Sequence, residues 1–217
     1  MVETENPKIL LFAEYAVDLK PGIGYYCSLQ LIFAYGYSSS VRFLLQQKWT
    51  PADFRPWIRE CLSHKSAKQQ HMFYALQDII VSIGAHLGMN VDFGMYSPSE
   101  AEINFDGCWR TDDAAILVEV KARSWPLANV SQLGAYMDRY AMRFEMPPDR
   151  VFGLFAVGEG DCQPLIDQVK GSAYRHRVKI AAFEDLLRLC QLKIDLGYAM
   201  GERRACRMVQ ALLMPFE

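Results

Sequence analysis

The chain has 217 residues, of which 51% are hydrophobic and 22% are charged. These values fit a folded domain of ordinary size with a substantial core, and they exclude a disordered chain. The formal net charge of −2 disfavours a protein that simply coats nucleic acid, because such proteins are usually basic overall.

Positive charge is nevertheless concentrated in one segment. Between Lys170 and Arg207 there are nine Lys or Arg residues and four Asp or Glu residues, so this segment carries +5 and the rest of the chain −7. Its densest points, Arg175-His176-Arg177 and Arg203-Arg204, could contact phosphates. The alternative, which we favour for each cluster taken alone, is a solvated helix face or helix end.

The cysteines and the apolar segments indicate a cytoplasmic protein. Six cysteines are scattered without a C-x-x-C pair, so neither a zinc ribbon nor a disulfide framework is expected. The N-terminus is acidic and lacks the basic start of a signal peptide. The apolar region Ile23–Leu45 is interrupted by Gln30, three serines and Arg42, which makes it a poor membrane span. We therefore expect no membrane partner.

The first part of the chain differs from the rest and contains no chemistry that we can name. We treat residues 1–64 as an N-terminal extension of unknown role and residues 65–217 as one domain. Within the extension a helix is predicted to begin at Thr50, because Pro51 suits the first helical position. The simplest role for the extension is packing against the domain.

The domain begins with the clearest helix of the chain, Ser66–Leu87, where apolar residues recur at helical spacing and Gly88 is a typical stop. The next predicted elements are strands at Asn90–Tyr96, Glu102–Trp109 and Ala114–Lys121, and a helix that contains Gln132 to Phe144. They are followed by a strand at Val151–Val157, a helix near Pro164–Lys170, a strand at Val178–Ala182, and helices at Phe183–Leu196 and Tyr198–Leu213.

This order of elements predicts the fold class. Strands that alternate with helices form an α/β domain, here with a central mixed sheet flanked by helices. A Rossmann domain is not indicated, because the strand–helix unit is not repeated and the chain has no Gly-rich phosphate loop.

Three charged residues are predicted to meet at one end of this sheet. Asp106 and Glu119 are symmetric about Asp112-Asp113, a plausible hairpin turn, so they would lie opposite each other with Cβ atoms about 5 Å apart. Lys121 shares a strand face with Glu119 because side chains alternate. Two carboxylates beside an ammonium form a site for a hard divalent cation. The alternative is a structural salt bridge from Lys121 to either acid.

This pattern resembles the PD-(D/E)XK nuclease superfamily, which has the restriction-endonuclease-like fold. The family places an Asp on one strand and a D/E-x-K triplet on the next, and here Asp106, Glu119 and Lys121 match them, with Phe105 in place of the Pro. The following helix contains Gln132-Leu133-Gly134-Ala135-Tyr136, which is similar to the Q-x-x-x-Y motif of one branch of these nucleases. The resemblance covers roughly residues 68 to 196.

The resemblance implies metal-dependent hydrolysis of phosphodiester bonds, with Asp106, Glu119 and Lys121 catalytic. Asp106 and Glu119 would bind Mg²⁺, for which Mn²⁺ can substitute, with the Val120 backbone carbonyl as a third oxygen ligand. Gln132 and Tyr136 would contact the substrate strand. Gly107 would leave room for a metal or a phosphate to approach closely.

Some candidate residues have a weaker basis. The family commonly has a Glu on the helix before the sheet, but no Glu occurs between Lys65 and Asn90. Asp78 could be a third carboxylate and Gln77 could meet a metal-bound water, or either could face solvent. Glu102 is a reserve acid, and Arg139 could extend a cationic track toward the substrate.

The sequence therefore predicts a metal-dependent nuclease that acts on DNA. The alternative is a catalytically silent nuclease-like subunit that binds nucleic acid or a partner protein. The acidic balance of the chain leaves open a homodimer or a partner protein of a larger DNA-processing or defence system.

Overall fold

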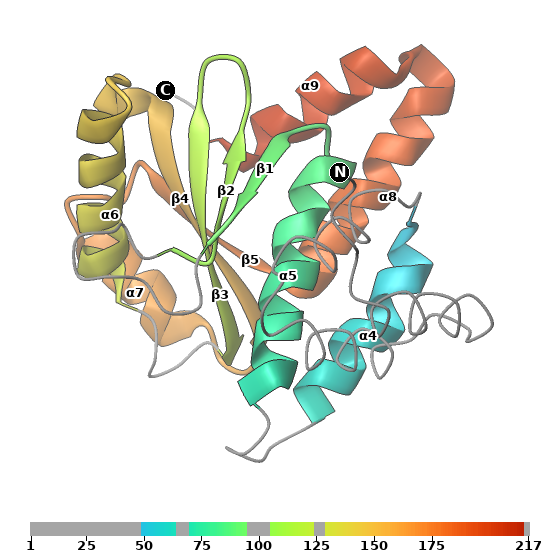
Figure 1. Ribbon diagram of the computed structural model, residues 1–217, viewed down its shortest axis with the longest axis horizontal. Helices are drawn as coiled ribbons and strands as arrows, with labels where there is room; N and C mark the ends of the chain where they lie inside the picture. The colour runs from blue at the N-terminus through green and yellow to red at the C-terminus, as the bar shows by residue number, and fades with distance from the viewer. Residues whose placement is uncertain (1–48, 64–69, 95–104, 124–128, 215–217) are drawn as a thin grey trace, which may run out of the picture.

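The protein is built around a five-stranded mixed sheet with helices on both faces (Figure 1). The structure, a computed structural model, describes residues 49–63, 70–94, 105–123 and 129–214. The strands are β1 (Asn90–Phe93), β2 (Gly107–Arg110), β3 (Ala115–Arg123), β4 (Val151–Glu159) and β5 (Val178–Ala182). β1, β2 and β3 are antiparallel neighbours, whereas β3, β4 and β5 run parallel. The predicted α/β class with a mixed sheet is confirmed.

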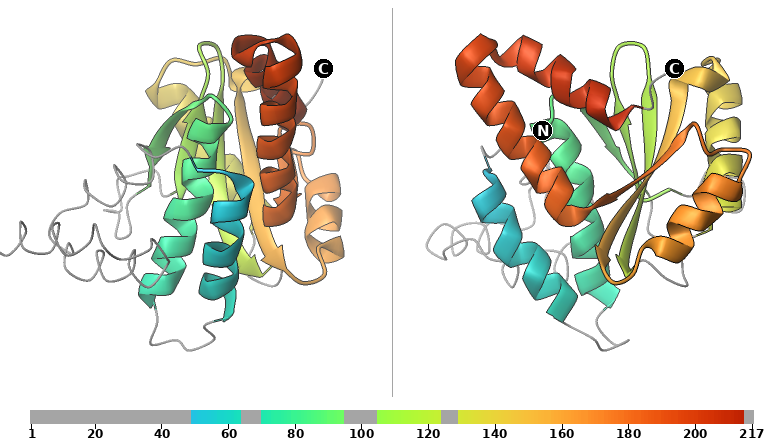
Figure 2. Two further views of the ribbon diagram at one scale, coloured as in Figure 1. Left: turned by 90° about the vertical axis from the view of Figure 1, so that its right-hand side faces the viewer. Right: turned by 180° about the vertical axis from the view of Figure 1, so that it is seen from behind.

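The helices form a layer on each side of this sheet. They are α4 (Pro51–Ser63), α5 (Gln70–His86), α6 (Val130–Arg143), the short 3₁₀ helix η1 (Pro148–Arg150), α7 (Gln163–Gly171), α8 (Phe183–Met200) and α9 (Glu202–Leu213). Figure 1 shows α6 and α7 at the left of the sheet and α4, α5, α8 and α9 at its right. Figure 2 shows the same separation from behind.

Two hydrophobic clusters fill the spaces between these layers. One joins the odd-numbered side chains of β3, such as Leu117, to α6 and α7. The other joins the even-numbered ones, such as Val118, to α4, α5 and α8. A central strand that is buried on both faces is expected to be apolar at every position. Charged residues at its end, such as Glu119 and Lys121, are therefore exceptional.

The register of the predicted hairpin is confirmed. Gly107 pairs with Val118 and Arg110 with Ala115, which is the symmetry about Asp112-Asp113 that the sequence predicts. Thr111 closes the turn, because its hydroxyl bonds the Asp113 carboxylate at 3.0 Å and accepts from the Ala114 N–H at 3.1 Å.

Several predicted boundaries are wrong. A strand was expected over Glu102–Trp109, but the observed strand β2 begins at Gly107, and Phe105 and Asp106 precede it. Positions 102 to 104 lie outside the described residues. In the register of β2 and β3, Phe105 would face Val120, but the Asp106 side chain accepts the Val120 N–H instead and ends the ladder.

The last two helices also divide later than predicted. α8 continues to Met200, and Gly201, at φ 86°, separates it from α9. Glycine adopts a positive φ at less steric cost than residues that have a side chain. By contrast, Gly88 ends α5 as predicted, at φ 82°.

The described part of the N-terminal extension packs into the core. α4 buries Phe54, Trp57 and Ile58 in the cluster shared with α5 and α8. The start of this helix is stabilised by Asp53 in its first turn, whose carboxylate accepts the backbone N–H and the hydroxyl of Thr50, each at 2.7 Å. Residues 1–48 lie outside the described residues, so the division of the chain at residue 64 stays a prediction.

Two further expectations concern cysteines and membranes. The five cysteines in the described ranges are free thiols. None of the described helices is long and apolar enough to cross a bilayer.

Candidate active site

Glu119 and Lys121 form an ion pair at the end of β3. The Lys121 Nζ lies 2.6 Å from the Glu119 Oε1, and the two side chains are only 17% and 20% exposed, respectively. Both project from the sheet face that α6 covers, since neighbouring odd-numbered residues of β3 pack there. Of the salt bridges that the sequence left open, the structure has the one between Lys121 and Glu119.

Asp106 lies beside this pair, in a bend directly before β2. Its Oδ2 accepts the backbone N–H of Val120 at 2.6 Å, and its Oδ1 accepts a hydrogen bond from the Gln77 side-chain amide on α5. Asp106 is therefore fixed between the end of β3 and the middle of α5. Both carboxylates and the Lys121 ammonium lie at the end of β3, but Asp106 is not paired with Glu119 across the hairpin, because the β2–β3 pairing begins at Gly107 and Val118.

Close packing of α5 against β2 brings Gln77 to Asp106. Gly107 is buried, and a Cβ at this position would lie 2.4 Å from the Val81 Cγ1. One turn further along α5, Gly84 makes room for the Trp109 ring, whose Nε1 donates to the Val81 carbonyl at 2.7 Å. The prediction that Gly107 leaves room for a metal or a phosphate is therefore wrong, because Val81 fills that space.

The surroundings of Asp106 favour its protonated form. Burial raises the pKa of Asp106 to about 7, and the negative charges of Glu119 and Asp78 act in the same direction. The Val120 hydrogen bond and the Lys121 charge lower the pKa but do not outweigh burial. Near neutral pH, Asp106 can therefore hold or release a proton, and a nearby cation would favour release.

Gln77 and Asp78 are both buried, with 8% and 3% of their surface exposed. The alternative that they face solvent is wrong. Gln77 contacts Asp106 directly, whereas Asp78 influences Asp106 through its charge. Sequence reasoning favoured neither residue strongly, because spacing along a helix does not fix which side faces the sheet.

The oxygen atoms at this site suit a hard cation. Within a strand, the N–H and C=O of one residue point to the same neighbouring strand. The Val120 N–H donates to Asp106, so the Val120 carbonyl faces the same side. Two carboxylates and one carbonyl fit Mg²⁺, which keeps several water ligands. In the described ranges no cluster of three or more His, Cys, Asp or Glu side chains is arranged to hold a metal, so protein carboxylates would supply only part of the coordination.

The Q-x-x-x-Y helix begins at the same end of the sheet, because α6 follows β3 in the chain. Asn129 caps it by accepting the Gln132 N–H at 3.1 Å, and the Gln132 side-chain amide donates to the Tyr136 hydroxyl at 2.7 Å. Gln132 and Tyr136 therefore act as one polar unit on the first turns of α6. The structure gives them no hydrogen bond to the carboxylate site, and Arg139 is exposed one turn further on.

The remaining candidate residues for binding a cation or phosphate lie away from the carboxylate site or outside the described residues. Glu102 lies outside the described residues. The basic cluster at Arg177 lies where β5 begins, with Arg177 bonded to Asp138 at 2.9 Å. Arg203 and Arg204 are on α9, which crosses the end of the sheet opposite to the arrowhead of β3 (Figure 1). These basic clusters do not border the site.

Comparison with known proteins adds no relative. The chain matches no protein-family model and no curated protein. We therefore infer function from the residues themselves and from the resemblance of their pattern to the PD-(D/E)XK superfamily.

Proposed function

We propose that the chain is a metal-dependent nuclease that hydrolyses phosphodiester bonds in DNA and has a restriction-endonuclease-like core. The observation that carries this proposal is the cluster of Asp106, Glu119 and Lys121 at the end of a strand whose first four residues, 115 to 118, are all apolar and buried. Charged groups are costly to bury, so such a cluster indicates function more often than structure.

The carboxylates would hold the cation. Asp106 and Glu119 offer hard oxygen ligands, and the Val120 carbonyl is a third. When bound, Mg²⁺ would lower the pKa of a water ligand and neutralise charge on the phosphate. The Asp106 proton would leave when the cation binds, because the carboxylate is the ligand form.

Lys121 would act on the reacting phosphate. Its Nζ can donate up to three hydrogen bonds, and one of them goes to Glu119. The remaining N–H groups can orient the attacking water or stabilise the negative charge that develops on the phosphate oxygens. Glu119 would hold the ammonium in place while it also serves the cation.

The substrate strand would pass the first turns of α6. The side-chain amide of Gln132 and the hydroxyl of Tyr136 offer hydrogen bonds to phosphate or sugar oxygens, which position a strand without reading its sequence. The preference for DNA rests on the resemblance to the nuclease superfamily, and RNA is the alternative substrate to be tested.

The experiment is cleavage of linear, circular and single-stranded DNA with Mg²⁺ or Mn²⁺. Wild type should cleave at least one form, and Glu119→Ala should not. Asp92→Ala is the matched control, because Asp92 is an exposed carboxylate that pairs with Arg110 at 2.7 Å on β1 and β2, and it should retain activity. Cleavage by Glu119→Ala at the wild-type rate would refute the proposal.

A second candidate is a silent nuclease-like subunit that binds nucleic acid or a partner. It is favoured by the hydrogen bonds that both oxygens of Asp106 already accept from Gln77 and Val120, since these bonds complete the site without a cation. Binding of DNA without cleavage of any substrate form, together with no binding of Mn²⁺, would support this candidate over the enzyme.

A further inference from the structure

A close contact lies in the middle of the Q-x-x-x-Y segment of α6. Gly134 is buried, and a Cβ at this position would lie 2.1 Å from the Tyr174 Cε2 and 2.4 Å from its Cζ. Non-bonded carbon atoms normally lie about 3.5–4.0 Å apart. Because glycine has no Cβ, the Tyr174 ring packs directly on the backbone of α6.

This contact lies behind Gln132 and Tyr136. An α-helix turns by about 100° per residue, so residues two positions before and two positions after Gly134 both lie about 160° away from it around the helix axis. Exposure agrees with this geometry, because Gln132 is exposed and Tyr136 half-buried, whereas Gly134 is buried. Tyr174 therefore contacts α6 on the side opposite to the polar unit of Gln132 and Tyr136.

Side-chain contacts hold the Tyr174 ring in place. Its hydroxyl donates to the Asp138 Oδ2 at 2.8 Å, and the Arg177 Nη2 donates to the Asp138 Oδ1 at 2.9 Å. The Arg177 guanidinium also lies over the ring, 5.3 Å from its centroid, and its Nη1 donates to the Pro148 carbonyl at 2.8 Å. Asp138 is one turn after Gly134 on α6, so the ring cannot turn aside without breaking these bonds.

The backbone that carries Tyr174 is anchored to the sheet. The Tyr174 carbonyl accepts the N–H of Arg177 at 2.8 Å and the N–H of Val178, where β5 begins, at 3.0 Å. The Arg177 carbonyl accepts the N–H of Gly153 on β4 at 2.8 Å. The position of α6 is therefore set from behind by a side chain that β4 and β5 hold.

We propose that Tyr174, held by Asp138 and Arg177, is a positioning residue that fixes α6 so that Gln132 and Tyr136 meet the substrate strand. Misplacement by about 1 Å can cost about 10²-fold where groups must be oriented on a substrate. Groups that are already ordered before binding also lose less entropy when the ligand arrives. This inference rests on the proposed nuclease function, which assigns Gln132 and Tyr136 to the substrate strand.

The first test adds one methyl group behind the motif. In Gly134→Ala the new Cβ would overlap the Tyr174 ring, so α6 must move outward. Binding of labelled single-stranded and duplex oligonucleotides, measured in chelator, should weaken by about tenfold, which corresponds to roughly one lost hydrogen bond. Mn²⁺ affinity should be unchanged, because neither Asp106 nor Glu119 is on α6. Gly197→Ala is the matched control and should bind as wild type, because its Cβ would meet no described atom within 4 Å on α8.

The second test removes the ring. Tyr174→Ala should weaken binding by a few-fold, because α6 loses its support. Combined with Gly134→Ala it makes room for the added methyl group, so the double variant should bind more tightly than Gly134→Ala alone. In a background with Gln132→Ala and Tyr136→Phe, Gly134→Ala should cause no further loss, because the groups that it misplaces are absent. A purely structural contact would lower the unfolding temperature without producing this pattern.

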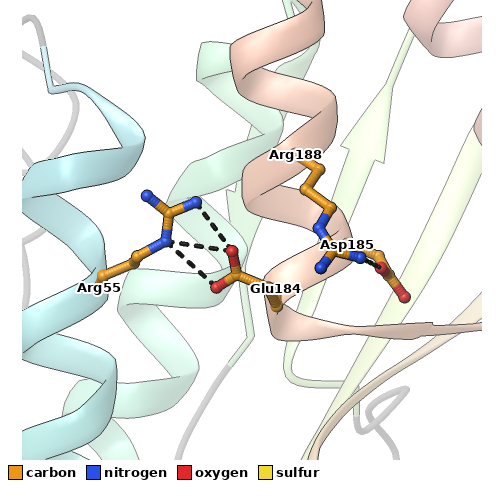
Figure 3. Close-up of polar contacts among 4 residues, drawn as sticks. All are labelled: Arg55, Glu184, Asp185 and Arg188. Atoms are coloured by element: carbon orange, nitrogen blue, oxygen red, sulfur yellow. Dashed lines mark hydrogen bonds and ion pairs between the residues drawn. The ribbon is translucent and has the colours of Figure 1, made fainter.

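A comparable pair on the other face of the sheet provides a further control. Arg55 of α4 donates from its Nη2 to Glu184 of α8 at 2.8 Å and from its Nε at 3.1 Å (Figure 3). Asp138→Ala and Glu184→Ala each remove a carboxylate that joins two parts of the fold. Asp138→Ala should weaken oligonucleotide binding by a few-fold, whereas Glu184→Ala should lower only the unfolding temperature. Equal affinities in these two variants would contradict the positioning role, including the case in which Gly134→Ala does not fold.

Three other results would overturn the inference: no oligonucleotide binding by wild type, wild-type affinity in Gly134→Ala, or a double variant that binds no better than Gly134→Ala. Because binding is measured without metal, these results can be separated from failure of the nuclease proposal. If the chain binds strands in the expected pattern but cleaves none, the positioning role stands and the enzyme does not. If it cleaves DNA while Gly134→Ala binds as wild type, the enzyme stands and the positioning role does not.

Discussion

The two ends of the sheet carry the same kinds of charged residue in different surroundings. At the end of β3, Glu119 and Lys121 are about one-fifth exposed and lie beside Asp106. At the opposite end, where the hairpin turns, Arg110 and Asp92 form an ion pair that is 46% and 49% exposed. Exposed pairs contribute little to stability and place no special demand on their surroundings. Burial beside further carboxylates is what separates a candidate site from ordinary surface charge.

The comparison also shows how each end is held. At the turn end, Gln210 of α9 donates to the Leu87 and Gly88 carbonyls that end α5. At the site end, Gln77 of α5 donates to the Asp106 carboxylate. The first contact completes a helix terminus, whereas the second orients a charged side chain. A glutamine side-chain amide therefore stabilises a helix end at one end of the sheet and, in the proposed function, orients a metal ligand at the other.

The largest effect is expected at Lys121. Lys121→Met should reduce the cleavage rate by about 10²–10³-fold, because it removes a donor that stabilises charge in the transition state. Mn²⁺ affinity should change much less. Single-turnover cleavage with saturating metal measures this, and Arg110→Met, at the turn end, is the control that should keep its rate. Equal losses in both variants would contradict the contrast between the ends.

Gln77 should control metal affinity. Gln77→Leu removes the hydrogen bond that orients Asp106, and loss of such an outer partner commonly weakens metal binding by about 10–100-fold. Gln210→Leu changes the same residue type at the other end and should leave metal affinity unchanged, although it should reduce stability. Calorimetric titration with Mn²⁺ and thermal unfolding of both variants provide the two readings. Unchanged Mn²⁺ affinity in Gln77→Leu would remove Gln77 from the site.

The dependence of stability on pH should reveal the buried carboxylate. The pKa of Asp106 is raised to about 7 in the folded protein from 3.8, so the folded state binds this proton more tightly than the unfolded chain. The stability that this provides is present below pH 4 and is lost as the pH rises through about 7. Relative to wild type, Asp106→Asn should gain stability across this window, by at most about 1.4 kcal/mol per pH unit. Urea unfolding in chelator tests this, and a difference that stays constant from pH 4 to about 8 would contradict it.

The smallest effect is expected at the exposed pair of the turn end. A double-mutant cycle on Asp92 and Arg110 should give a coupling free energy of about 1 kcal/mol or less. DNA cleavage by all three variants should match that of wild type. A coupling free energy well above this value would mean that the exposed pair at the turn end interacts more strongly than its exposure to solvent indicates.

The sequence could predict those features that local pattern decides. Symmetry about Asp112-Asp113 gave the register, because a short turn fixes which residues of a hairpin face each other. The same symmetry predicts that Asp106 and Glu119 lie at one end of the sheet. The stop at Gly88 and the start of α4 followed from capping chemistry in the same way.

Features that depend on contacts between distant segments could not be predicted. The contact of Gln77 with Asp106 depends on the rotation of α5 about its axis, which Val81 and Trp109 set by packing. The Arg55–Glu184 pair joins residues 129 positions apart, and neither residue belongs to a motif. The break at Gly201 could not be separated from one at Gly197 by sequence, because either glycine can end a helix.

The central claim is that the buried carboxylates at the end of β3 bind a divalent cation. Calorimetric titration of Mn²⁺ into wild type, Asp106→Asn and Asp92→Asn tests it most directly. The account predicts that wild type and Asp92→Asn bind equally and that Asp106→Asn loses about a hundredfold or more in affinity. Absence of binding to wild type, or equal loss in the two variants, would contradict it.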